Sequence, residues 1–517
     1  MTRWLKLLIV CLMLLPVTET TAQAQCGYAD TFEFPVDTTA FRLVQDFGAP
    51  SPRHQGRFHT GEDWYGGRGT SYGQFVRAAA AGRVTFSSPN GWGRDGGVII
   101  LEHTFRDGTT AYSMYGHITD ATGVEFPTVF TCVRAGDILA AVGDVRPAPH
   151  LHFEIRTENP NLPGPGYTWE NPEASGWRRP SKFVLNMQTQ LSDYYLWRAD
   201  IAAETGPITP PVQLEDYSLI FLDANRVLRA STDGRILWRA VLQRPAVGLM
   251  PRTNDTLIAY ADGTMQPINR DSTLTEAWQT GVTLDSAPMP AWGVYVFHTP
   301  QNELVAIDGS AQNVVWRLAD VPPILRWAAN ENVLGVMTET SEMLTISRSG
   351  ELLDRASLRE PGALAVSPTG ALLAYTRGGL WTIGDDGTWT LESDVFPQGS
   401  STGALAFDAL GNLYLFDGAT LLAYSPDRVA LWQSELPGFE GMTTLSVHDN
   451  ILLLASSGGQ IAAVQAQTGA VCNRARIWGD WRSRLWHQLN DDGVLRVYVA
   501  DQIVGLDWRD FLLACGT

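Results

Sequence analysis

The sequence predicts an all-β protein, mainly antiparallel, in which a small β domain is followed by an array of repeated β units. Three observations support this. The 517 residues include 49 glycines, and turns rich in Gly, Asn and Asp separate short β-prone runs. An Asp-Gly pair at 107–108 separates two such runs, which is a hairpin signal. From residue 217 onward, similar runs recur with a period of about 39 residues.

Residues 1–24 have the pattern of a secretory signal peptide. Arg3 and Lys6 supply the positive end, residues 7–17 the apolar run, and residues 22–24 the small-x-small cleavage site. The apolar run is too short for a membrane-spanning helix, which needs about 20 residues. We therefore expect an extracytoplasmic protein, whether secreted, periplasmic or at the cell surface, without a transmembrane anchor.

Four cysteines remain once Cys11 is removed with the signal peptide. An even number of cysteines in an exported chain indicates disulfides, and three pairings are possible. The simplest choice joins Cys26 to Cys132 and Cys472 to Cys515, because each of these bridges stays within one part of the chain.

The chain is acidic, with a formal net charge of -18. This balance argues against a nucleic-acid ligand, whose phosphates require Lys and Arg. Solubility is its simplest meaning.

Histidines cluster in the first third of the chain. Six of the nine fall between His54 and His152. The pair at 150 and 152 can share one face if the segment is a strand, since alternate residues point the same way. A His and an Asp at 59 and 63 are close enough for one turn to direct both at one ion. Because a zinc ion that activates water takes three protein ligands of these types, the cluster predicts a metal site.

The HxxxD, YxH and HxH elements at 59–63, 115–117 and 150–152 resemble the lysostaphin-type (LytM-like) zinc endopeptidases, which cut peptidoglycan cross-bridges. The resemblance covers roughly residues 38–160 and includes the family-like phrase Arg-Ala-Gly-Asp-Ile-Leu at 134–139. It implies a small β domain with a peptidase active site.

The resemblance also implies a role for each matching residue. One zinc ion would be held by His59, Asp63 and His152, while His117 and His150 would be the catalytic histidines. Every position of the pattern is occupied, so an active peptidase acting on peptidoglycan peptides is the expected function. The alternative is a non-catalytic envelope binding or regulatory protein that uses the same fold as a docking module.

Residues 98–101 and 109–114 form the predicted hairpin, which would carry His117 beyond its second strand. His103 is expected to be structural, and His54 to be a loop residue. Four aromatic residues are assigned with equal weight to a substrate groove or to the core: Trp64, Tyr65, Trp92 and Tyr115.

Composition places a domain boundary after residue 200. The peptidase-like domain is predicted over 25–200, with a short helix at 192–204. A Pro-rich linker follows at 201–216, because prolines resist collapse and mark a boundary. Residues 217–517 form the repeat domain.

The repeats predict a seven- or eight-bladed β-propeller, since units of this length hold about four strands. Their register is marked by Trp238, Trp278, Trp316, Asp354, Trp389, Trp432, Cys472 and Leu513. Residues 302–316 and 459–469 resemble quinoprotein-like (PQQ-repeat) propellers. The resemblance implies the scaffold and not a bound quinone, so no cofactor is expected there. A protein or glycan ligand, and a targeting role, is the working hypothesis for this domain; a simple spacer is the alternative.

Overall fold

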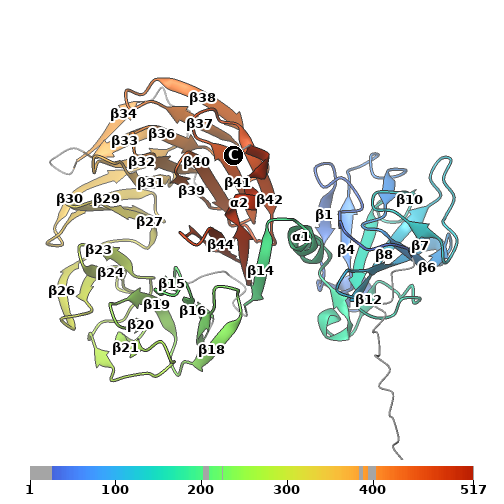
Figure 1. Ribbon diagram of the computed structural model, residues 1–517, viewed down its shortest axis with the longest axis horizontal. Helices are drawn as coiled ribbons and strands as arrows, with labels where there is room; N and C mark the ends of the chain where they lie inside the picture. The colour runs from blue at the N-terminus through green and yellow to red at the C-terminus, as the bar shows by residue number, and fades with distance from the viewer. Residues whose placement is uncertain (1–25, 202–208, 224, 384–387, 394–402, 516–517) are drawn as a thin grey trace, which may run out of the picture. The chain divides into compact units, whose positions relative to one another are not determined.

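The computed structural model describes residues 26–201, 209–223, 225–383, 388–393 and 403–515. The chain divides into two compact units, residues 1–188 and 189–517 (Figure 1). The predicted signal peptide at 1–24 lies outside the described residues, as do residues 202–208 of the predicted linker at 201–216. In the described part of the chain, no helix has both the length and the apolar character needed to cross a membrane.

The first unit is built on a ten-stranded antiparallel sheet whose main path runs β1-β4-β11-β8-β7-β6-β9. Its strands are β1 (Arg42–Gln45), β4 (Glu62–Tyr65), β5 (Phe75–Arg77), β6 (Gly82–Ser88), β7 (Gly97–Thr104), β8 (Thr110–Thr119), β9 (Cys132–Val133), β10 (Ile138–Val142), β11 (Leu151–Arg156) and β13 (Trp177–Arg178). A small sheet joins β2 (Pro50–Ser51), β3 (Arg57–His59) and β12 (Tyr167–Thr168). The helical segments are η1 (Pro52–His54), η2 (Gly93–Asp95), η3 (Pro172–Ser175) and α1 (Pro180–Gln190).

The predicted hairpin is confirmed as β7 and β8, which pair around the Asp-Gly turn. Strand β11, at the centre of the sheet, is buried along its whole length. Its odd-numbered residues, Leu151, Phe153 and Ile155, are apolar core residues. Its even-numbered residues, on the opposite face, are polar and equally buried. A buried line of polar side chains is costly unless every member is paired, so this face marks the site.

The second unit is a β-propeller of eight four-stranded antiparallel sheets within the described residues. The first seven blades in chain order are β15 (Val212–Gln213), β16 (Leu219–Asp223), β17 (Arg226–Ala230) and β18 (Ile236–Val241); β19 (Ala246–Pro251), β20 (Thr256–Tyr260), β21 (Thr264–Ile268) and β22 (Trp278–Gln279); β23 (Met289–Ala291), β24 (Val294–His298), β25 (Leu304–Asp308) and β26 (Asn313–Leu318); β27 (Ile324–Ala329), β28 (Val333–Thr338), β29 (Glu342–Ser347) and β30 (Leu352–Ser357); β31 (Ala363–Val366), β32 (Leu372–Thr376), β33 (Gly379–Ile383) and β34 (Trp389–Ser393); β35 (Ala404–Phe407), β36 (Leu413–Phe416), β37 (Thr420–Tyr424) and β38 (Ala430–Glu435); and β39 (Thr443–His448), β40 (Ile451–Ser456), β41 (Gln460–Gln465) and β42 (Val471–Arg476). Of the two predicted blade numbers, eight is therefore correct.

The eighth blade is assembled from both ends of the propeller. Strands β43 (Leu485–Leu489), β44 (Val494–Val499) and β45 (Gln502–Asp507) are joined by β14 (Tyr195–Asp200), which pairs with β45. The short helix predicted at 192–204 is therefore wrong. Residues 197, 199 and 201 are buried and those between them are not, which is the period of a strand.

The predicted repeat register falls on the last strand of each of the first seven blades. Its eighth marker, Leu513, lies instead in a 3₁₀ turn, η4 (Leu513–Cys515), after the short helix α2 (Trp508–Phe511). The outer strand of the eighth blade is β14, which comes before the first repeat in sequence, so the chain after β45 does not supply a fourth strand. Both predicted disulfides are present: Cys26 with Cys132, and Cys472 with Cys515.

Candidate metal centre

Three neighbouring strands bring the sequence elements together. Strand β11 lies between β4 and β8, so His152 is paired with Asp63 on one side and with Gly116 on the other. His59 is the last residue of β3, just before the turn that leads to β4. The HxxxD, YxH and HxH elements are therefore adjacent in space although they are far apart in sequence.

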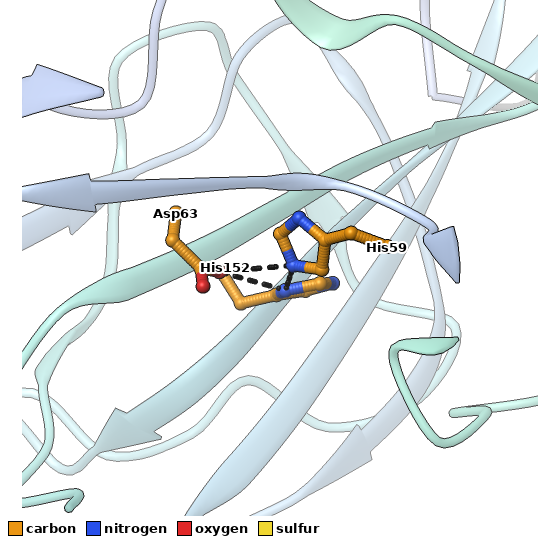
Figure 2. A group of neighbouring side chains, drawn as sticks. All are labelled: His59, Asp63 and His152. Atoms are coloured by element: carbon orange, nitrogen blue, oxygen red, sulfur yellow. Dashed lines mark hydrogen bonds and ion pairs between the residues drawn. The ribbon is translucent and has the colours of Figure 1, made fainter. Parts of the chain in front are cut away.

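The three predicted ligands converge, as Figure 2 shows. His59 Nε2 lies 3.0 Å from His152 Nδ1, and Asp63 Oδ1 lies 3.2 Å from the first of these atoms and 3.0 Å from the second. All three side chains are buried. In a tetrahedral zinc site with bonds of about 2.0–2.1 Å, two ligand atoms are about 3.3 Å apart. The triangle has the size of one face of such a site.

In both histidines, the ring nitrogen that points away from the triangle donates a hydrogen bond. His59 Nδ1 donates to the Asp46 carbonyl at 3.1 Å, and His152 Nε2 donates to Glu154 Oε1 at 2.9 Å. These partners set the tautomers, so each neutral ring turns a lone pair toward the Asp63 carboxylate. Three lone pairs then face one another with no hydrogen among them. Such a set is balanced only by a proton or a metal cation, and the donor types suit zinc.

Glu154 anchors this arrangement from behind. Its Oε1 accepts from Thr60 Oγ1 at 2.6 Å, and its Oε2 accepts from Arg156 Nε at 2.6 Å and from Trp177 Nε1 at 2.8 Å. Burial raises the pKa of Glu154, but Arg156 and His152 outweigh this and lower it to about 2. The carboxylate is therefore ionised and holds the His152 ring in one orientation.

The electrostatics of the triangle favour a positive charge. Burial raises the pKa of Asp63, yet its contacts with His152 and His59 bring that pKa well below the usual value. Burial lowers the pKa of His152, whereas Asp63 and Glu154 raise it, with a net result of about 9. In the protein without a metal, a proton on His152 thus balances Asp63, since Glu154 is already paired with Arg156. A metal ion would take the place of that proton.

His117 reaches the cleft from an irregularity in β8. The register with β7 shifts at 116–118, which leaves His117 as the extra residue of a bulge with a φ of 61°. Its Nδ1 donates to the Asp95 carbonyl at 2.7 Å. Burial, followed by the repulsion of His150 and His152, lowers the pKa of His117 to about 3. Its ring is therefore neutral at physiological pH, with the hydrogen on Nδ1 and the lone pair on Nε2.

His150 faces the same space. Its Nδ1 donates to the Ala148 carbonyl at 2.8 Å, and its Nε2 lies 3.5 Å from Asp63 Oδ2. The His150 and His117 ring centroids are 4.6 Å apart. All five residues predicted from the sequence are thus brought together. In His117 and His150, Nδ1 is bound to a backbone carbonyl, so Nε2 is the nitrogen left for other contacts.

A cleft of about 820 Å³ opens beside these residues. Asp63, His117, His150 and His152 contribute to its lining. Of the four aromatic residues with two possible roles, Tyr65 and Trp92 line the cleft, whereas Trp64 and Tyr115 are core residues.

The contacts of the two remaining histidines of the cluster show where each one lies. His103 is fully buried and bonded to the Ala81 carbonyl and to Ser113 Oγ, so it is structural as expected. His54 lies in η1 and also lines the cleft, where it stacks on Tyr167 at a ring distance of 3.7 Å.

Several site residues were not foreseen. Glu154 continues the spacing of two set by His150, just before β11, and His152, within it, and this spacing could have revealed it. The backbone carbonyls of Asp46, Asp95 and Ala148 orient three histidines. Residue identity does not predict these contacts, because every residue has a carbonyl.

Comparisons with known proteins agree with this division of the chain. Residues 57–163 match the family model of peptidase family M23, and residues 189–321 match that of the outer membrane protein assembly factor BamB. No curated protein sequence matches the chain.

The solved structures that are similar to the chain include three propeller-containing examples of low sequence identity. BamB from Moraxella catarrhalis is 14% identical over 60% of this chain and 99% of its own, with a TM-score of 0.46. The computationally designed Ika8 protein is 14% identical, with 60% and 99% coverage and a TM-score of 0.47. A quinohemoprotein alcohol dehydrogenase, ADHIIG, from Pseudomonas putida HK5 is 12% identical, with 61% and 76% coverage and a TM-score of 0.44.

From the family matches and the strand topology, the chain joins a peptidase family M23 (LytM-type) domain to a β-propeller with BamB-like repeats.

Proposed function

We propose that the protein is an extracytoplasmic zinc metalloendopeptidase that hydrolyses peptide cross-links of bacterial peptidoglycan. The observation that carries this proposal is the triangle of His59, Asp63 and His152, whose three lone pairs need a cation. The match to peptidase family M23 supports the reaction class. The two disulfides support an oxidising compartment outside the cytoplasm.

The residues of the triangle would hold the zinc ion, with His59 and His152 oriented by the Asp46 carbonyl and by Glu154. When bound, zinc supplies an activated water and polarises the scissile carbonyl. The cleft beside the triangle would accept the peptide in an extended form.

His117 and His150 would move the protons. Each has its Nδ1 hydrogen committed to a carbonyl, so each Nε2 accepts a proton when the ring is neutral. One of them would take the proton from the attacking water and deliver it to the leaving amine. The other, once protonated, would donate to the oxyanion.

A direct test measures bound metal by mass spectrometry together with chelator-sensitive hydrolysis of purified peptidoglycan. We expect one zinc ion per chain and activity that is lost with chelator and restored by zinc. The variants His117→Ala and His150→Ala should keep the metal and lose most turnover, whereas His59→Ala should lose both. His448→Ala, in the propeller, serves as the control. Absence of both zinc and hydrolysis would instead favour the non-catalytic docking protein.

We propose that the propeller binds a wall or protein ligand and so targets the peptidase. Hydrolysis of soluble muropeptides and binding to intact sacculi should be compared between the full chain and a fragment ending at residue 188. Targeting predicts that the fragment cuts soluble substrate normally but binds sacculi more weakly. Equal binding by both would leave the propeller a spacer.

A further inference from the structure

Three arginines lie on the wall of the catalytic cleft. Arg42 begins β1, Arg53 is in η1, and Arg146 lies in the connection from β10 to β11. All three side chains are exposed. They come from separate segments of the chain, yet they line the same cleft as the candidate metal ligands and catalytic histidines.

None of these three arginines forms a salt bridge within the described residues. Other arginines of the same unit do so: Arg83 with Glu102, Arg106 with Asp30 and Arg179 with Asp46. In the part of the chain that the structure describes, one of the three contacts an aromatic ring: the Arg42 guanidinium lies 5.8 Å from the Tyr65 ring centroid. Three guanidinium groups are thus available to a ligand.

Two acidic residues line the cleft beside these three arginines: Asp63, which belongs to the triangle of candidate metal ligands, and Asp95, whose carbonyl orients His117. The arginines therefore outnumber the carboxylates of the cleft wall by one. A bound divalent ion would make the cleft still more positive. This contrasts with the net charge of -18 of the whole chain, so the positive charge is local to the cleft. Guanidinium groups bind carboxylates through paired, charge-assisted hydrogen bonds.

We propose that Arg42, Arg53 and Arg146 select peptides that carry free carboxylates close to the scissile bond. The substrate class is then an anionic stem peptide, in which a γ-linked glutamate retains its α-carboxylate, and not an uncharged glycine bridge. This inference rests on the proposed peptidase function and adds the chemistry by which the substrate is recognised. The arginines act in specificity and take no part in the proton transfers.

The test compares two synthetic stem peptides that differ at one group. Each contains a γ-linked D-glutamate, with its α-carboxylate either free or amidated, and carries a fluorescent label at the same end. For the zinc-loaded full chain, we expect kcat/KM to be roughly tenfold higher for the free acid, as a few partly exposed charge pairs would give. Binding of both peptides to the metal-stripped full chain, followed by fluorescence polarisation, should show a preference of the same sign. Because salt screens exposed charges, the preference should shrink at high ionic strength.

A triple variant tests whether the arginines cause the preference. In Arg42→Gln/Arg53→Gln/Arg146→Gln, the ratio between the two peptides should fall to about one, with zinc content as in the native chain. The control is Arg68→Gln/Arg134→Gln/Arg348→Gln, which removes three exposed charges that do not line the cleft and should retain the ratio.

The outcomes separate the two levels of inference. If the native chain cuts both peptides at equal rates, carboxylate selection is overturned while the peptidase function stands. A preference that survives the triple variant overturns it as well, because the arginines are then not its source. If neither peptide nor peptidoglycan is cut but the free acid still binds in an arginine-dependent way, the peptidase function fails and the anionic recognition stands.

Discussion

At the scale of single residues, the candidate metal centre depends on a buried pair of opposite charges behind the triangle of His59, Asp63 and His152. Glu154 is fully buried, and Arg156 is 2% exposed. The arginine also donates to the Leu162 and Pro163 carbonyls and lies over the Trp177 ring, but among the described residues its carboxylate partner is Glu154. Removing one member of such a pair leaves the other charge buried alone, which is far more costly than removing both.

This pair predicts that the structural and metal-orienting roles of Glu154 can be separated. Glu154→Gln should destabilise the first unit by roughly 3–5 kcal/mol, because Arg156 loses its counter-charge. It should also weaken zinc binding roughly 10- to 100-fold, because the His152 ring is oriented less firmly. The double variant Glu154→Gln/Arg156→Gln should regain much of the stability but not the zinc affinity. Thermal unfolding and competitive zinc titration measure the two effects. Full recovery of zinc affinity in the double variant would contradict the orienting role.

His103 gives a prediction about pH. Burial lowers its pKa to about 4, below the ordinary value of 6.5. Between these values the unfolded chain binds a proton at this position and the folded chain does not, so stability falls as the pH falls. The loss amounts to about 3 kcal/mol when the pH has dropped from above 6.5 to 4. Above pH 6.5 the contribution is constant.

Two measurements check the behaviour of His103. Its ring resonance in NMR spectra should not titrate between pH 8 and 5. In His103→Gln, whose side chain can still contact the Ala81 carbonyl and Ser113, the unfolding temperature should decrease less steeply with acid than in the native chain. A His103 resonance that titrates near pH 6.5 would show that the ring is not held neutral.

At the scale of elements, the bulge in β8 decides where His117 points. The preceding residue is Gly116, and the Trp92 ring occupies the space that a Cβ at this position would need. Trp92 is itself fixed by a hydrogen bond to the Gly164 carbonyl. The small residue, the ring and the bulge together place His117 beside His150.

In the proposed peptidase, Gly116→Ala should therefore impair catalysis without removing the metal. The added methyl group must displace either Trp92 or the bulge, and a shift of about 1 Å in a catalytic group can lower the rate about 100-fold. We expect kcat to fall by that order while zinc content is unchanged. Gly116→Ala/Trp92→Leu, which makes room for the methyl group, should recover part of the loss. No recovery would mean that Trp92 is not the group in conflict.

The sequence predicted the elements that follow a local period and missed those that do not. The spacing of two in the HxH element, and the four residues from His59 to Asp63, predicted that these side chains meet, while the role of each residue was implied by the family resemblance and stays a prediction. The bulge at His117 could not be read, because a register shift depends on the partner strand β7. For the same reason the orienting carbonyls were invisible, since every residue has one.

At the scale of the whole molecule, the two units were predicted because each has its own sequence signature. The histidine elements mark the first, and the repeat of about 39 residues marks the second. The closure of the propeller was missed, since β14 and its partner β45 are separated by nearly the whole repeat domain. Local sequence gave β14 a helical interpretation, and only pairing with a distant strand makes it the outer strand of the eighth blade.

This closure predicts where the propeller can be cut. Trp197 of β14 packs in a buried cluster with Phe221, Tyr498 and Ile503, so a fragment beginning at Val212 loses the fourth strand and this ring. The loss of a buried Trp alone costs roughly 3–5 kcal/mol, and β45 is left as an open sheet edge prone to association. The fragment 189–517 should therefore be monomeric and unfold cooperatively. The fragment 212–517 should unfold at lower temperature and aggregate.

Size-exclusion chromatography and thermal unfolding distinguish the two fragments, and two further samples identify the cause. Trp197→Ala in the fragment 189–517 keeps the backbone pairing of β14 but removes the ring, so its unfolding temperature should lie between those of the two fragments. A synthetic peptide covering residues 189–201, added to the fragment 212–517, should pair with β45 and raise its unfolding temperature, because an open edge accepts an extended strand. If the fragment 212–517 is as stable as 189–517 and ignores the peptide, the propeller closes without β14. The second unit would then begin after residue 200, in agreement with the boundary predicted from composition.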